Sequence, residues 1–222
     1  MSVPVQSLHL ADAREADDLA AFLARLIHYD RAAAVRLQAG SGALAVFGRP
    51  PSFEVLAIRT ARLAEPVELD VTVSAGELLE SLGGARFTVP GAVTGPPWAG
   101  VLPPRGGWRE LAGLPDVHAM RGAVAAAVAE FRARDEALPV ERRTRAERDR
   151  IGREIWSRTV GGTGLPLRAV HAAQSLGFLR PGVPVALLAA GTWLRLRTPF
   201  GSVAVRTNGL GGLSVTPVRP TS

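Results

Sequence analysis

Few side chains in this sequence are of types and spacings that could do chemistry. The histidines are scattered, and none shows the close spacing in which two histidines bind one metal ion: His9, His28, His118 and His171. The densest polar cluster, His28–Tyr29–Asp30, lies where a helix is expected to end, and the helix dipole stabilises a histidine there. A general base also needs a group that positions it. We therefore predict no metal site, no cofactor and no catalytic residue.

The absence of lysine and cysteine removes further kinds of chemistry. All 26 basic residues are arginine, so neither a Schiff base nor a thiolate nucleophile is possible. The glycines at 161–164, GGTG, suggest a phosphate loop, but the next helix opens with Pro166, which has no N–H to donate. The chain is expected to be non-enzymatic. Because it needs no disulfide, we also expect it in the cytoplasm.

Positive charge is concentrated in the second half of the chain. Residues 1–111 carry a net charge of −2, and residues 112–222 carry +8. From Ile155 to the end there are seven arginines and no acid. Such a segment attracts anions at long range, which favours nucleic acid or another polyanion as the partner.

The sequence TWLRLRT, expected as a strand over 192–198, places an aromatic ring among arginines. Alternation puts Trp193, Arg195 and Arg197 on one face and two leucines on the other. If the next strand, 201–207, pairs with it as a hairpin, Arg206 joins them on an exposed face. We expect the arginines to contact phosphates and Trp193 to stack on bases, with Arg168 as a further candidate. The alternative is that this face is merely solvated.

Apolar periodicity and capping patterns predict the elements that position these residues. Helices are expected over 11–30, 77–82, 117–131, 144–158 and 166–177. Ser74, Asp116 and Thr144 are the predicted N-caps of three of them. Strands are expected over 33–39, 43–48, 53–62, 67–73, 85–90, 183–189, 192–198 and 201–207.

The two ends of the chain resemble each other. VRLQAGSGALAV, from Val35, and VALLAAGTWLRL, from Val185, share apolar positions, and a helix precedes each. The prediction is an α+β fold with two helix-plus-three-strand modules, possibly an internal duplication, joined by central helices. The expected parts are an N-terminal module (1–90), a packed loop (91–115), central helices (116–160), a basic C-terminal module (161–207) and a flexible tail (208–222).

The loop contains GPPWAGVLPPRGGW, residues 95–108, with two tryptophans. Flexible linkers are polar, whereas these tryptophans would be costly to leave in water. We favour a rigid loop packed on the core, with a ligand lid and a segment presented to a partner as alternatives.

These observations favour a non-enzymatic protein that binds an anionic partner, nucleic acid above all, through its basic C-terminal module. The alternative is a protein–protein scaffold or homodimer that uses the apolar helices and the tryptophan loop. The longest apolar runs are too short to span a bilayer, so no membrane association is expected.

Overall fold

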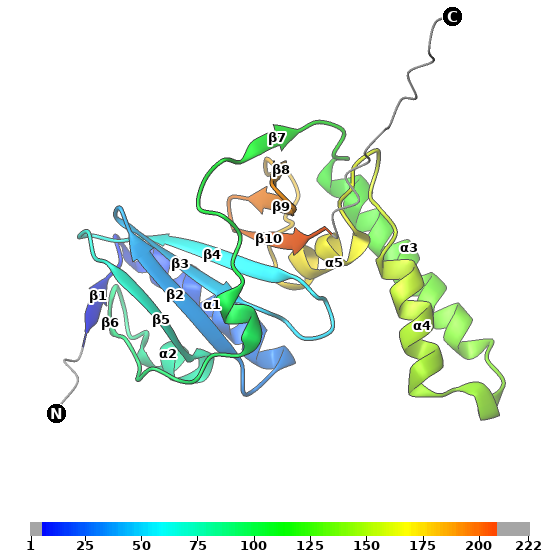
Figure 1. Ribbon diagram of the computed structural model, residues 1–222, viewed down its shortest axis with the longest axis horizontal. Coiled ribbons are helices and arrows are strands. Elements are labelled where there is room, and N and C mark those ends of the chain that lie inside the picture. The colour runs from blue at the N-terminus through cyan, green and yellow to red at the C-terminus, as the bar shows by residue number, and fades with distance from the viewer. Residues whose placement is uncertain (1–5, 208–222) are drawn as a thin grey trace, which may run out of the picture.

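The computed structural model describes residues 6–207, and the predicted α+β class is confirmed (Figure 1). The helices are α1 (Ala13–Tyr29), α2 (Ala75–Ser81), α3 (Val117–Glu136), α4 (Arg145–Trp156) and α5 (Leu167–Ser175), with short 3-10 helices η1 (Pro97–Gly100) and η2 (Val140–Arg142). The strands are β1 (Ser7–His9), β2 (Ala34–Gly40), β3 (Ala43–Gly48), β4 (Leu56–Arg62), β5 (Leu69–Ser74), β6 (Arg86–Thr88), β7 (Arg109–Leu111), β8 (Ala186–Ala190), β9 (Trp193–Thr198) and β10 (Gly201–Arg206).

Side-chain caps fix where four of the helices begin. Each cap accepts a hydrogen bond from a backbone N–H three residues later, which satisfies one of the free donors of the first turn. The caps are Asp12, Ser74, Asp116 and Thr144, and the last three confirm the sequence prediction.

Eight strands form one antiparallel sheet in the order β5-β2-β3-β4-β10-β9-β8-β7. The two predicted groups of three strands are therefore not separate sheets. They join where β4 pairs with β10, with Ile58 opposite Ser202 and Leu56 opposite Ala204. Each of these strands would otherwise leave an edge of unpaired backbone groups, and pairing satisfies both edges. β1 and β6 form a separate two-stranded sheet.

Counted outward from the β4–β10 pair, the three strands of each meander follow in the same order, but the outermost strand β5 comes after its meander in the chain and β7 comes before its own. In the first half the meander β2-β3-β4 follows α1, and in the second half β8-β9-β10 follows α5. One further strand flanks each meander, β5 on one side and β7 on the other. This arrangement agrees with two like modules, while their origin by duplication stays a prediction.

The main core lies between one face of the sheet and helices α1 and α5; in Figure 1, α1 lies behind β2 and β3, and α5 lies beside β10. It contains buried residues from both halves of the chain. Phe22 of α1 stacks on Phe178, which follows α5, with 5.8 Å between ring centroids. Helices α3 and α4 pack beside α5 and project from the body as a hairpin (Figure 1).

The opposite face of the sheet is crossed by residues 91–108, which we call the strap (Figure 1). Its Trp98 and Leu102 pack on a second apolar cluster, made of Phe47, Leu56, Ile58 and Ala204 from β3, β4 and β10. The indole N–H of Trp108 donates to the carbonyl of Pro104 at 3.0 Å. After the strap comes β7, a strand inside the region predicted as loop.

Candidate anion-binding face and cleft

The predicted basic residues of β9 and β10 lie on the face of the sheet that the strap crosses. β9 and β10 form the expected hairpin, with Arg206 opposite Trp193 and Ala204 opposite Arg195. Because side chains alternate along a strand, Trp193, Arg195, Arg197 and Arg206 point to the same side. Arg197 and Arg206 are exposed, whereas Trp193 and Arg195 are half-buried.

Trp193, the residue expected to stack on bases, is half-buried. Its ring packs at the edge of the second apolar cluster, together with Trp98 and Leu102 of the strap. This face of the sheet carries Phe47, Leu56 and Ile58, whose apolar surface has to be covered. The strap covers that surface and leaves Trp193 half-buried at its edge.

The structure does not bring Arg168 to this face. Arg168 belongs to α5, which packs on the other side of the sheet against β9 and β10. Its Nε is buried and has no hydrogen-bond partner among residues 6–207. Its side chain therefore lies in the helical layer, apart from the other four candidates.

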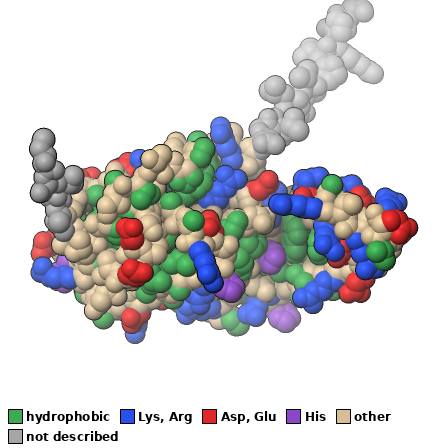
Figure 2. All heavy atoms as spheres, turned by 90° about the horizontal axis from the view of Figure 1, so that it is seen from below, with side chains coloured by type: hydrophobic (Ala, Val, Ile, Leu, Met, Phe, Trp, Pro, Cys, Tyr) green, Lys and Arg blue, Asp and Glu red, His purple; other side chains and the backbone are tan. Residues whose placement is uncertain are grey.

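Several arginines on the α3–α4 hairpin differ from those of β9 and β10 in having acidic partners. Arg134 contacts Glu154 at 2.7 Å, and Arg158 contacts both Glu130 and Glu154. Figure 2 shows this alternation of basic and acidic side chains on the projecting hairpin, at its right. Within residues 6–207, no ion pair is found for Arg195, Arg197 or Arg206 (salt bridges are confined to other arginines).

Arg195 is held in place by two contacts, neither of them with an acid. Its Nε donates to the hydroxyl of Ser202 at 2.8 Å, and its guanidinium carbon lies 5.7 Å from the ring centroid of Trp108. Burial, and then the charge of Arg197, lower the pKa of Arg195. An arginine stays protonated under such conditions, so the site holds a partly desolvated positive charge.

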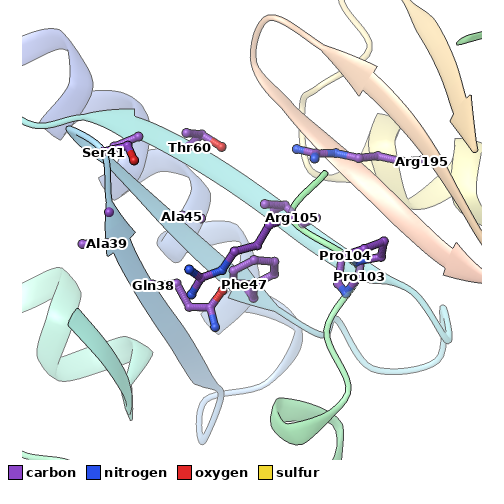
Figure 3. Close-up of a pocket in the computed structure, with 13 residues that line it drawn as sticks. Gln38, Ala39, Ser41, Ala45, Phe47, Thr60, Pro103, Pro104, Arg105 and Arg195 are labelled. Carbon is purple, nitrogen blue, oxygen red and sulfur yellow. The ribbon is translucent and has the colours of Figure 1, made fainter. Parts of the chain in front are cut away.

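A cleft of about 250 Å³ lies between the strap and the sheet. Figure 3 shows Arg195 reaching from β9 toward Thr60, and Arg105 reaching from the strap over Gln38 and Phe47. Two hydroxyl groups, of Ser41 and Thr60, also line it. Its remaining lining is small or apolar: Ala39, Gly40, Ala43, Ala45, Ile58, Pro103 and Pro104.

Sequence reasoning missed this cleft, although one signal was present. On the β3 face toward the strap, Ala43 and Ala45 precede Phe47, and two such small side chains are unusual on a covered face. In the sequence, Arg105 is only one residue of a proline-rich loop. The roles of the small β3 residues and of Arg105 become visible once the strap is placed over the sheet.

The part of the chain from 6 to 207 holds no group of three or more His, Asp or Glu side chains positioned to bind a metal ion. Over the same residues, no helix combines the length and the apolar character needed to cross a membrane.

Two family models match the chain, one after the other. Residues 3–100 are similar to a family described as a domain of unknown function (DUF8010), and residues 103–210 to another domain of unknown function (DUF8185). None of the curated proteins compared with the chain matches it. The two matched segments meet inside the strap, between η1 and the cleft residues Pro103, Pro104 and Arg105.

Proposed function

We propose that this protein is a non-enzymatic, cytoplasmic binding protein that engages a polyanion, with nucleic acid favoured, through its basic C-terminal half. The observation that carries the proposal is the set of arginines on β9 and β10 without acidic partners in the described chain. Arg197 and Arg206 are the exposed members, and they contact phosphates in this proposal. The +8 net charge of residues 112–222 attracts the partner from a distance.

The geometry favours contacts to the backbone of a nucleic acid over contacts to its bases. Side chains two residues apart on one face of a strand are about 7 Å apart, so Arg195 and Arg197 form a short row of positive charge. Trp193 packs beside the strap and is half-buried, so it offers less ring surface for stacking than an exposed tryptophan. Binding is therefore expected to depend steeply on salt and little on base sequence.

The test is fluorescence anisotropy with labelled single- and double-stranded DNA and RNA at several salt concentrations. Plotted against log salt, log affinity falls with a negative slope. The double variant Arg197→Ala/Arg206→Ala is expected to reduce the magnitude of this slope by roughly 2, one for each lost phosphate contact. The matched control is Arg132→Ala/Arg153→Ala, which removes the same charge from exposed positions on the α3–α4 hairpin.

Absence of binding at low salt, for every nucleic acid tried, would sink the proposal. An equal loss in both double variants would show that only net charge matters, and would also count against the face. The homodimer alternative relied on apolar helix stripes and the tryptophan loop. Ile151 and Ile155 of α4 are buried in the main core, and Trp98 packs on the sheet, so the described fold does not favour that alternative.

A further inference from the structure

The cleft under the strap exists because small side chains interrupt an otherwise covered face of the sheet. Ala43 and Ala45 of β3 lie between the β2–β3 turn and Phe47. Their small side chains leave space next to the sheet, whereas Phe47 and Ile58 fill the corresponding space further along the strands. Pro103 is buried where the strap meets the sheet, and Pro104 and Arg105 follow it at the rim. The hollow is thus bounded by two firmly packed elements and has an apolar floor.

Most polar groups that line the cleft are hydrogen-bond donors. The guanidinium group of Arg195 reaches the cleft from β9, on the side of the sheet. Its Nε is used by Ser202, while its two terminal nitrogens have no hydrogen-bond partner within residues 6–207. Arg105 reaches over the same space from the strap, and the hydroxyls of Ser41 and Thr60 face it (Figure 3). This set of donors matches the oxygens of a carboxylate or a phosphate.

A partly buried cation without an anion is an energetic cost that a bound anion would offset. Taking a charge out of water is unfavourable unless an opposite charge and hydrogen bonds compensate for it. Contact with the ring of Trp108 compensates in part. Because Trp108 also donates to Pro104, the same ring couples the position of Arg195 to that of the strap.

Two acids lie at the β2–β5 end of the cleft and limit the ligand to one anionic group. The carboxylate of Glu68 lies 3.3 Å from the position that a Cβ on Gly40, a residue of the lining, would take. Asp70 pairs with Arg36 at 2.8 Å and accepts a hydrogen bond from Gln38 at 3.2 Å. Gln38 lines the cleft, so Asp70 lies just beyond that wall and repels a second negative group there. The volume, about 250 Å³, suits a body no larger than one aromatic ring or a short acyl chain.

We propose that the cleft between strap and sheet binds a small organic anion, with its carboxylate or phosphate group on Arg195 and its apolar body against Ala45, Phe47 and Ile58, while Arg105 lines the cleft from the strap. This site shares Arg195 with the polyanion face proposed above, whereas Arg197 and Arg206 lie outside the cleft. Its ligand is a discrete small molecule, in contrast to a polymer held by its backbone charge.

The test uses the full-length protein and two probes, benzoate and phenyl phosphate, with benzyl alcohol as the neutral control. Binding is followed by two-dimensional ¹H–¹⁵N NMR of the arginine Nε–H groups. A saturable shift of the Arg195 Nε–H with either acid, and none with benzyl alcohol, is expected. Arg195→Gln is expected to weaken binding about tenfold or more, as for loss of a charged hydrogen-bond partner.

A second variant tests the cleft without touching its charges. Ala45→Leu fills the hollow and is expected to abolish saturable binding, and Ala43→Leu serves if Ala45→Leu does not fold. The matched charge control, Arg132→Gln, is expected to leave the affinity for both probes unchanged, because Arg132 is exposed on α3 and does not line the cleft.

Each outcome decides the proposal. Binding of benzoate alone identifies a carboxylate site, of phenyl phosphate alone a phosphate site, and of both a site for either oxyanion. Lack of saturation with both acids overturns the proposal, and so does equal binding of benzyl alcohol or binding that survives Ala45→Leu and Ala43→Leu. Loss of nucleic-acid binding in Arg197→Ala/Arg206→Ala has no bearing on these results, so the two proposals fail separately.

Discussion

Arginine has two different roles in this protein, and its neighbours decide which. Arg59 of β4 is buried and contacts Asp18 of α1 at 2.9 Å and Glu15 at 3.6 Å, so it ties the sheet to a helix. Arg195 is half-buried too, yet its contacts are a hydroxyl and an aromatic ring. An isolated sequence cannot separate these cases, because Asp18 and Arg59 meet only when α1 packs on β4. Alternation along the strand correctly predicts the face of the sheet on which Arg195 lies. It does not predict that Arg195 has no acidic partner within residues 6–207.

Glycine at position 201 is predicted to be indispensable to the β9–β10 hairpin. Its φ of +149° disfavours other residues, and a Cβ there would lie 2.5 Å from the ring of Phe178. Gly201→Ala is therefore expected to reduce the free energy of unfolding by about 1–3 kcal/mol, measured by urea denaturation. The control is Gly162→Ala, where a Cβ meets no atom within 4 Å. Similar losses in the two variants would contradict this explanation.

At the scale of elements, the α3–α4 hairpin depends on ion pairs because it projects from the body (Figure 1). Glu154 of α4 accepts two hydrogen bonds of 2.7 Å from Arg134 of α3. Those bonds, and then the charge of Arg134, lower the pKa of Glu154 from 4.5 to about 2. Ile151 and Ile155 anchor the part of α4 nearer the body in the main core.

This arrangement predicts how the hairpin responds to pH. A carboxyl group whose pKa is lower in the folded state stabilises the fold above its unfolded pKa, and this contribution is lost as the pH falls. Glu154→Gln is expected to lower Tm at pH 7 and low salt. The difference from the unmodified protein should shrink between pH 4.5 and about pH 2. Thermal unfolding by circular dichroism measures it, with the exposed Glu136→Gln as control. A difference that persists unchanged at pH 2 would refute the assignment.

Most elements could be predicted from the sequence because their signals are local. The caps Ser74, Asp116 and Thr144 mark helix starts, and alternation marks β9 with Trp193 on one face. The three-residue strands β1 and β7 were missed, since so few residues show no periodicity. The sequence predicts that the strap packs on the core, but it does not predict that the strap packs beside Trp193. Which face it crosses depends on contacts between distant parts of the chain.

At the scale of the whole molecule, the pairing of β4 with β10 creates features that neither half has alone. It makes one sheet of two meanders and gives them one continuous core. The cleft is a product of this joining, because its lining comes from β2, β3, β4, the strap and β9. No local sequence pattern predicts that β4 pairs with β10, so neither the single sheet nor the cleft could be predicted.

The shared core predicts that both halves unfold as one unit. Leu19 of α1 is fully buried in the first half, and its replacement by alanine is expected to cost about 2–5 kcal/mol. If the halves are coupled, the most protected amides of β8 and β9 lose as much protection as those of β2 and β3, because all exchange through global opening. Hydrogen exchange followed by mass spectrometry measures both sets. Leu187→Ala, at an equally buried position of β8, is the reciprocal variant and should deprotect β2 and β3 to the same degree as β8 and β9. If each substitution weakened only its own half, the β4–β10 pairing would be a contact between two independent domains.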